Sequence, residues 1–397
     1  MHILGHRGRR AAAAVAAAGL LLAGCSGGDE PADDTAAADD GAGFTVTDVA
    51  GRTVTLDKAP ERVLFGESRA AFVTSFLQKD EPSDKIVAWG NDLQSAASDF
   101  YDRLVEADPA TADIADIGHF KKDDVSVETL LAQQPDIMVL TLQQKEVAEE
   151  RGMLKKFDDA GLKYVFTDFR EDPLNNTVPS VELVGKVLDR EEEAADFARM
   201  YNEKLEMVKE RVAKADAKPK AFLWRAAGLA DCCATFGTEN LGGVLTTAGA
   251  ENIADGLLED KAEGDLTVEK VISAEPEDIV LTGGDWTAYL KDKPEKAAVD
   301  YTRLGYNYDA DEARESFGAV LDATPGMEEV KAVKDGHVYG IYHQFYDSPF
   351  NIFALEAMAK WLLPEEFPDV DPAKEFADFH AEHMPFEAEG TFFAELS

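Results

Sequence analysis

The amino-acid sequence predicts an α/β protein in which a long α-helical segment joins two Rossmann-like lobes. Three observations lead to this prediction. Short apolar, β-rich runs alternate with longer amphipathic stretches, residues 178–217 carry a helical stripe without an internal turn signal, and one pattern of residues occurs twice. Strands that are almost wholly apolar and separated by helices are typical of parallel sheets covered on both faces.

The chain is strongly acidic. Its 397 residues include 39 Lys+Arg and 78 Asp+Glu, for a formal net charge of -39, and 45% of them are hydrophobic. This hydrophobic content suffices for one or two sizeable cores. A field of this sign opposes nucleic acid and anionic membranes, which charge-driven binders recognise with basic surfaces. We therefore expect no nucleic-acid partner, and any anionic ligand must be held by a local cluster of Arg or Lys.

The N-terminus predicts export and lipidation. Residues 5–10 read GHRGRR and precede the apolar stretch 11–23, which is typical of a secretory signal and too short to span a membrane. Residues 22–25 read LAGC and resemble the bacterial lipobox, so we expect removal of residues 1–24 and acylation of Cys25. The acyl chains would hold the protein at the outer face of the bacterial cell membrane. The alternative is an ordinary cleaved signal.

Residues 25–43 are expected to form a lipidated Cys followed by a disordered acidic tether. Residues 26–43 are small or acidic and lack large apolar side chains, so they cannot build a core. No later segment offers about 20 consecutive apolar residues, and the chain is therefore not itself a channel or permease.

The folded part divides into an N-terminal lobe, residues 44–177, and a C-terminal lobe, residues 218–397. Apolar β-rich runs predict the strands, and the amphipathic stretches between them predict helices. The expected strands are 62–65, 86–89, 137–141 and 163–167 in the first lobe and 220–224, 278–282 and 338–342 in the second; the expected helices include 126–134, 154–160 and 267–274.

Residues 178–217 predict a long helix, or two closely joined helices, between the lobes. Apolar residues recur there at three- or four-residue spacings and make an amphipathic stripe. The stripe consists of Leu183, Val187, Ala194, Ala198, Tyr201, Leu205, Val208 and Val212. The alternative is a helical hairpin at the periphery of the molecule.

An internal repeat supports two similar lobes. Residues 125–140, VSVETLLAQQPDIMVL, align with residues 266–281, LTVEKVISAEPEDIVL, after one inserted residue. Each copy offers a Ser or Thr as a helix N-cap, a Glu in the first turn, an apolar helix face and a Pro before a buried strand. These residues are Ser126, Glu128 and Pro135 in the first copy and Thr267, Glu269 and Pro276 in the second.

These features in their order resemble one family. The lipobox, the acidic tether, the opening FTVTDVAGRTVTLDKAPERV, the two repeats and the long middle helix are similar to those of the substrate-binding lipoproteins of ABC importers for ferric siderophores, haem and cobalamin. The resemblance implies a fold like that of class III periplasmic binding proteins. It also implies that Glu128 and Glu269 dock onto Arg residues of a permease dimer, which works with its ATPase. The alternative is that each Glu only favours its helix N-terminus.

The residues that follow the expected strands are candidates for ligand contact. Ligands of open α/β sheets bind beyond the carboxyl ends of the strands. The candidates are Arg69, Lys121, Arg170, Arg225, Trp286, Tyr342, His343 and Tyr346. Arg donors bind ligand oxygens and aromatic rings stack on ligand faces, so this set suits an anionic, flat or aromatic chelate.

Each candidate also has an ordinary structural interpretation. The three Arg side chains would pair with some of the 78 acids, Lys121 would lie in a solvated loop, and Trp286 would form an apolar lid. His343 would be a satisfied structural side chain. Its functional alternative, as in some members of the resembled family, is to complete the coordination of an incompletely chelated ferric ion together with Tyr342 or Tyr346.

The remaining chemistry-bearing residues indicate no enzyme. Cys232 and Cys233 form a vicinal disulfide, or else two free thiols, an intermolecular link or a soft metal contact. His380 and His383 are expected as a surface pair, because two His without a third ligand do not make a zinc site. The sequence has no G-x-S-x-G, P-loop or H-E-x-x-H motif.

Together these observations predict a monomeric extracytoplasmic lipoprotein that captures a ferric siderophore in an interlobe cleft, without a cofactor of its own, and delivers it to an ABC permease. The alternatives are the same fold with cobalamin, haem or molybdate as cargo, and, more distantly, a surface enzyme or an adhesive lipoprotein.

Overall fold

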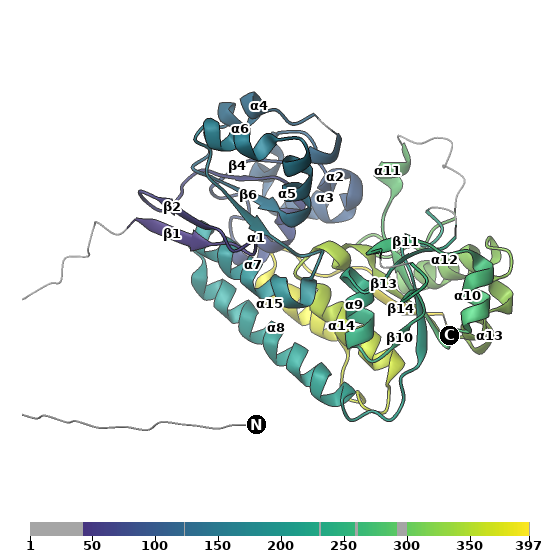
Figure 1. Cartoon of the computed structure of the whole chain (residues 1–397). Coiled ribbons are helices and arrows are strands. Elements are labelled where there is room, and N and C mark those ends of the chain that lie inside the picture. Colours follow the sequence, from purple (N-terminus) through teal and green to yellow (C-terminus); the bar gives the residue numbers. More distant parts are fainter. Residues whose placement is uncertain (1–42, 123, 230–231, 259–260, 292–299, 397) are drawn as a thin grey trace, which may run out of the picture. The chain divides into compact units, whose positions relative to one another are not determined.

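The computed structural model describes residues 43–122, 124–229, 232–258, 261–291 and 300–396. The predicted signal peptide, the predicted lipidation site Cys25 and all of the predicted tether except Gly43 lie outside the described residues. From Gly43 onward the chain forms one compact unit. Within it, the described helices and strands make two α/β lobes (Figure 1).

The N-terminal lobe is built on a parallel sheet with the strand order β5-β4-β3-β6-β7. Its strands β3, β6 and β7 are apolar and buried on both faces, as expected for a sheet covered by helices. An antiparallel hairpin of β1 (Phe44–Thr47) and β2 (Thr53–Leu56) precedes it. The sheet strands are β3 (Val63–Phe65), β4 (Ile86–Trp89), β5 (Ala115–Asp116), β6 (Ile137–Thr141) and β7 (Tyr164–Thr167); the helices are α1 (Ala71–Leu77), α2 (Leu93–Ala96), α3 (Ser98–Ala107), α4 (Val127–Ala132), α5 (Leu142–Glu150) and α6 (Met153–Asp159).

The C-terminal lobe repeats this plan with the strand order β10-β8-β12-β13-β14, in which only β14 is antiparallel to its neighbour. A small antiparallel sheet of β9 (Ala234–Phe236) and β11 (Glu263–Asp265) is added to it. The main strands are β8 (Lys220–Trp224), β10 (Glu251–Asn252), β12 (Asp278–Gly283), β13 (Val338–Tyr342) and β14 (Phe393–Glu395). The helices are α9 (Asn240–Thr247), α10 (Val268–Ala274), α11 (Thr287–Lys291), α12 (Ala310–Asp322), α13 (Lys331–Asp335), α14 (Asn351–Leu362) and α15 (Pro372–His383).

The segment between the lobes is a pair of helices, α7 (Pro173–Leu188) and α8 (Glu191–Val212), which pack against each other. The break falls at Asp189, whose backbone is left-handed with a φ of 61°. Helix α8 packs against α1 of the first lobe and against α9 and α14 of the second. Helix α7 packs against α1 and β7 of the first lobe and against α14 of the second, so the predicted stripe is divided between two helices that each contact both lobes (Figure 1).

The internal repeat marks equivalent elements, as predicted. The Ser126 hydroxyl accepts a hydrogen bond from the Thr129 N–H at the start of α4, and the Thr267 hydroxyl accepts one from the Lys270 N–H at the start of α10. Helix α4 leads into β6 and helix α10 leads into β12, and both strands lie inside their sheets. The caps form because these side chains satisfy N–H groups that the first helical turn leaves unpaired.

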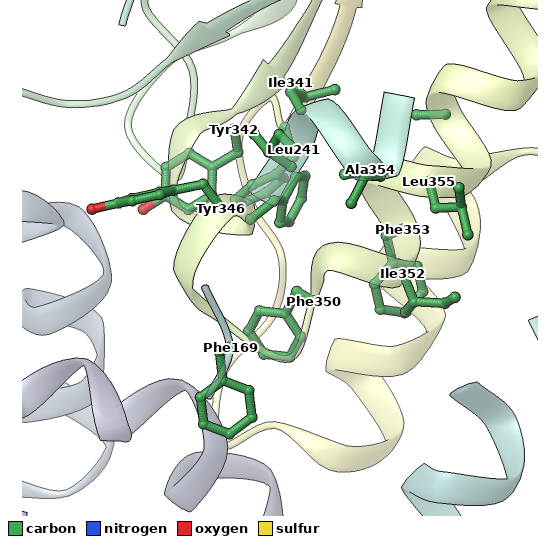
Figure 2. Close-up of a cluster of buried hydrophobic side chains, with 14 of the residues drawn as sticks. Phe169, Leu241, Ile341, Tyr342, Tyr346, Phe350, Ile352, Phe353, Ala354 and Leu355 are labelled. Atoms are coloured by element: carbon green, nitrogen blue, oxygen red, sulfur yellow. The ribbon is translucent and has the colours of Figure 1, made fainter. Parts of the chain in front are cut away.

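The two lobes share one apolar cluster. The ring of Phe350, beside α14, lies 6.1 Å from that of Phe72 and 6.3 Å from that of Phe76, both in α1 of the first lobe. Phe169, which follows β7, belongs to the same cluster (Figure 2). Because this contact removes apolar surface of both lobes from water, it holds the site-bearing ends of the two sheets close together.

Candidate functional site

The candidate site lies where the carboxyl ends of strands from both sheets meet. Arg69 lies in the short helix η1 (Ser68–Ala70) after β3, Arg170 follows β7, and Arg225 directly follows β8. Tyr346 and Asp347 belong to η6 (His343–Asp347), which follows β13. Distant parts of the chain thus converge, as the strand-end argument predicts.

The three arginines alternate with three carboxylates in one continuous chain of charges. Nε of Arg69 lies 3.4 Å from Oδ2 of Asp92 in an ion pair without a hydrogen bond, and Nη1 of Arg69 lies 2.7 Å from Oδ2 of Asp347. The same Asp347 oxygen lies 3.9 Å from Nη1 of Arg170. Arg170 continues through Nη2 to Oε2 of Glu263 at 3.3 Å, and Nη1 of Arg225 lies 2.5 Å from that oxygen. Three negative and three positive charges therefore alternate and cancel. We call these six residues the charge chain; in order they are Asp92, Arg69, Asp347, Arg170, Glu263 and Arg225.

Two aromatic rings lie against the charge chain. The guanidinium carbon of Arg170 is 4.7 Å from the ring centre of Tyr346, and that of Arg69 is 5.6 Å from the same centre. The guanidinium of Arg225 lies 5.3 Å from the ring of Phe236. The two rings are 6.4 Å apart and nearly parallel, at 24°. The site therefore combines cation–π contacts with two stacked rings, both of which are buried in this structure.

A buried acid lies beside these arginines. Glu67 lines a small pocket together with Arg69, Asp347 and Phe169, with a cavity volume of about 20 Å³. Burial raises the pKa of Glu67 to about 8, and the charges of Asp347 and Asp92 raise it further than the two nearby arginines lower it. At neutral pH the carboxyl of Glu67 therefore holds a proton and can donate a hydrogen bond to a ligand.

The His343 ring lies next to Tyr346, and Trp286 lies against His343. Nδ1 of His343 lies 2.8 Å from the Thr282 hydroxyl, and its ring lies 4.5 Å from that of Tyr346. Burial lowers the pKa of His343 well below its ordinary value, and the charge of Arg225 lowers it further, so the ring is neutral. Trp286 is buried with its ring 5.4 Å from His343.

Lys121 lies in η3 (Phe120–Lys122), and desolvation and then the charge of Arg170 lower its pKa.

Tyr342 takes a different place from the one expected of a ligand contact. Its ring is buried against Tyr306 and Phe392, and its hydroxyl donates to Oδ1 of Asp99 at 3.1 Å. The hydroxyl of Tyr306 in turn pairs with Nε2 of His380 at 2.8 Å. The expectation of a surface His380 was wrong, because this ring is fully buried in the aromatic core and only His383 is partly exposed.

The buried Asp99 makes stability depend on pH. It accepts from the N–H groups of Phe100 and Tyr306 and from Tyr342, and burial raises its pKa to about 6. Since this folded-state pKa exceeds the ordinary value, the folded chain binds the proton more tightly, and stability falls as pH rises from about 4 to about 6.

For Asp99→Asn we expect this part of the pH dependence to vanish. Urea unfolding of both proteins between pH 4 and pH 7 measures the difference in free energy of unfolding, which isolates Asp99 from other buried acids. The variant should be at its greatest disadvantage at pH 4 and regain about 2 kcal/mol relative to the wild type by pH 7. Parallel pH curves for the two proteins would contradict the assignment.

The two repeat acids lie on the surface. Glu128 occupies the first turn of α4 and Glu269 the first turn of α10, and both are exposed. Hydrogen bonds from its own backbone N–H and from the Thr267 side chain lower the pKa of Glu269. Both carboxylates are therefore accessible to a partner, one on each lobe.

Cys232 and Cys233 are joined by a disulfide. Cys233 is buried, and its N–H and C=O exchange hydrogen bonds with Leu266 at 2.9 and 3.0 Å. The disulfide thus lies at the end of the small sheet that carries Phe236 and Glu263.

Among the described residues no group of three or more His, Cys, Asp or Glu is arranged to hold a metal ion. No helix in the described part of the chain has the length and apolar character needed to cross a membrane.

Comparisons with known proteins agree with this architecture. The model of the periplasmic binding protein family matches residues 79–344 of this chain. The chain belongs to this family. It is similar to the TroA-like periplasmic binding protein FepB from Veillonella parvula, with 28% identity and a TM-score of 0.79 over 89% of this chain and 100% of that one. No curated protein sequence matches the chain.

Two more distant structures share the fold. The molybdate-bound MolA from Haemophilus influenzae has 17% identity and a TM-score of 0.63 over 87% of this chain and 99% of that one. A structure from Saccharomonospora viridis, described as an ABC-type Fe³⁺-hydroxamate transport system, has 18% identity and a TM-score of 0.51 over 80% and 98%. This membership makes the chain an extracytoplasmic solute-binding protein of the ABC transporter class, and the family consists of binding proteins that deliver to a permease.

The sequence analysis missed four residues of the site. Glu67 belongs to the strand-end segment 67–69 that also holds Arg69, and Asp347 directly follows Tyr346, but neither was selected as a ligand contact. Phe236 and Glu263 lie in the small β9-β11 sheet, whose short strands have no clear apolar pattern. Proximity to a selected residue was the one signal available, and it applied to the first two only.

Proposed function

We propose that this solute-binding protein is a lipoprotein, anchored through Cys25, that captures a ferric siderophore between its lobes and delivers it to an ABC permease. The convergence of Arg69, Arg170 and Arg225 above the rings of Tyr346 and Phe236 carries the proposal. Guanidinium groups suit the oxygens around a chelated iron, and the rings suit the flat faces of a chelator. The iron arrives as cargo inside its chelate.

A second candidate cargo is an oxyanion such as molybdate. The arginines would suit it, and MolA from Haemophilus influenzae is bound to molybdate in a similar fold. A small oxyanion makes no use of the paired rings of Phe236 and Tyr346, however, and these rings favour the larger chelate. Haem and cobalamin fit the rings, and their visible absorption bands distinguish them in a binding experiment.

The test is a tryptophan fluorescence titration of residues 26–397. The ligands are ferric hydroxamate, catecholate and citrate complexes, with cobalamin, haem and molybdate alongside. Trp286 is a built-in reporter because its ring contacts His343 next to Tyr346. We expect one ferric chelate to bind with a Kd below about 1 µM. Binding of molybdate alone would support the second candidate. If no iron chelate changes the fluorescence, the siderophore assignment is refuted.

We propose further that Glu128 and Glu269 dock the loaded protein onto the permease. They are exposed acids at equivalent positions of the two lobes, so they can meet the two halves of a permease dimer at once. Charge pairs at such an interface guide association.

Replacing both residues, in Glu128→Gln/Glu269→Gln, should lower transport about tenfold or more while the Kd for the chelate stays unchanged. The measurement is ⁵⁵Fe uptake by cells that carry the cognate permease. Glu192→Gln is the matched control, because Glu192 also lies exposed in the first turn of a helix, α8. If the control lowers uptake as much as the double variant does, the two acids serve only their helices.

A further inference from the structure

The acids of the charge chain differ in the groups that donate hydrogen bonds to them. Asp92 accepts hydrogen bonds from the N–H and the hydroxyl of Ser68 at 2.7 and 3.0 Å, so it is part of the frame of the N-terminal lobe. Within the described part of the chain, the carboxylates of Asp347 and Glu263 accept hydrogen bonds from arginines only. Both come from the C-terminal lobe, in η6 and β11.

Asp347 and Glu263 occupy the donors that an anionic ligand needs. Asp347 lies between Arg69 and Arg170, and Glu263 lies between Arg170 and Arg225. The Asp347 side chain is only 6% exposed, and the Arg69 and Arg170 side chains are each 16% exposed. These charges are withdrawn from water and interact strongly, whereas Arg225 and Glu263 are 31% and 45% exposed and their pairing is more screened by solvent. An approaching anion therefore meets paired arginines instead of three free cations.

We propose that Asp347 and Glu263 are internal counter-anions that set the charge a ligand must carry. In the unliganded protein they hold the arginines of the N-terminal lobe against the C-terminal lobe. A ligand binds by placing its own anionic oxygens on Arg69, Arg170 and Arg225 and displacing the two carboxylates. This inference rests on the proposed function, since it assigns the specificity-determining residues of the same site.

Displacement has a direct consequence for specificity. A highly charged chelate gains enough from the three arginines to offset the loss of the internal pairs, whereas a weakly charged anion does not. An uncharged chelate does not displace the internal carboxylates, so its binding does not depend on them. The acids thereby exclude abundant small anions from an otherwise cationic cluster, which is specificity by opposing charge.

The first experiment measures chelate binding by Asp347→Asn and Glu263→Gln. The probes are a trianionic ferric tris-catecholate and an uncharged ferric tris-hydroxamate. Removing either internal carboxylate should tighten binding of the trianionic chelate about tenfold, with the larger effect for the more buried Asp347, and change the Kd of the uncharged chelate less than about twofold. Equal changes for the two chelates, or weaker trianionic binding, would overturn the proposal.

Asp369→Asn is the matched control. Asp369 also accepts from an arginine, with its two oxygens 2.6 and 3.0 Å from the Arg211 guanidinium, but this pair lies outside the charge chain. The Asp369→Asn variant should therefore bind both chelates with the Kd of the wild type. A change as large as that of Asp347→Asn would mean that net charge alone is responsible, and would also overturn the proposal.

A second experiment needs no chelate and uses inorganic sulfate as the probe. In Asp347→Asn, the freed Arg69 and Arg170 should bind sulfate, so that sulfate raises the Tm of this variant by roughly 2 °C or more beyond its effect on Asp369→Asn. The control removes the general stabilising effect of sulfate. Equal shifts in both variants would overturn the proposal. If no ferric chelate binds but the specific sulfate shift appears, the siderophore assignment fails while the counter-anion role stands.

Discussion

Replacing Arg170 with Ala should weaken binding of the ferric chelate about 100-fold, a loss of about 2.8 kcal/mol. Arg170 is the central cation of the charge chain, because it reaches both Asp347 and Glu263 and covers the ring of Tyr346. The variant loses charge-assisted hydrogen bonds to the ligand. It also leaves the two acids less neutralised, so they repel an anionic chelate. Isothermal titration with the chelate that binds the wild type measures the effect.

Two further variants separate the role of Arg170 from a general loss of charge. Arg170→Lys keeps the charge but not the planar donor pair, and we expect an intermediate Kd. Arg314→Ala removes an exposed arginine that pairs with Asp311 on its own helix, α12, and should leave the Kd unchanged. Wild-type affinity in Arg170→Ala would show that the ligand does not use this end of the cleft.

Replacing Lys204 with Met should lower the free energy of unfolding by up to about 3 kcal/mol at pH 9, where Glu356 is ionised. Lys204 in α8 donates to both oxygens of Glu356 at 3.0 and 2.8 Å and also contacts Glu375. Glu356 lies in α14, and its side chain is fully buried. Without the ammonium group, the carboxylate of Glu356 remains buried and unpaired, and the contact of α8 with the second lobe weakens. Urea unfolding monitored by circular dichroism measures the loss.

The pH dependence of this variant identifies its cause. Burial raises the pKa of Glu356 to about 7, although Lys204 opposes the rise. A folded-state pKa above the ordinary value means that stability falls as pH rises from about 4.5 to about 7. Loss of Lys204 removes the opposing charge and raises the pKa of Glu356 further. The deficit of Lys204→Met should therefore be small near pH 5 and grow toward pH 8.

Lys209→Met provides the comparison on the same helix. Lys209 is exposed and pairs with Glu206 one turn away, so its loss should cost less than about 0.5 kcal/mol at any pH. A deficit for Lys204→Met that is equally small, or independent of pH, would show that Glu356 is not held in its charged form by Lys204.

Much of the architecture could be predicted because it depends on local patterns. The apolar runs around β3, β6, β8, β12 and β13 are buried strands, and Ser126 and Thr267 cap the helices that the repeat marked. Strand-end reasoning also selected Arg69, Arg170, Arg225 and Tyr346, which the structure brings together, while their contact with a ligand stays a prediction. A strand period or a helix cap is decided by neighbours in sequence, and those are visible in a single chain.

The partners of the site residues could not be predicted in this way. Arg69 and Asp347 are 278 residues apart, and Arg170 and Glu263 are 93 apart. Any of the many acids in the chain would have matched these arginines by charge alone. The same limit applies to His380, which sequence spacing suggested as a surface residue and which the packing of α15 buries beside Tyr306.

The sequence by itself determined the two α/β lobes, the repeated helix–strand unit and the strand ends from which the site is built, because apolar periodicity and capping act over a few residues. Only the tertiary structure decided that the predicted interlobe helix is two packed helices and that the Tyr342 hydroxyl donates a hydrogen bond to Asp99. It also decided that Asp347 and Glu263 form ion pairs with the arginines of the site. Those outcomes depend on which distant side chains meet when the lobes pack, and on the desolvation that gives each charge a specific partner.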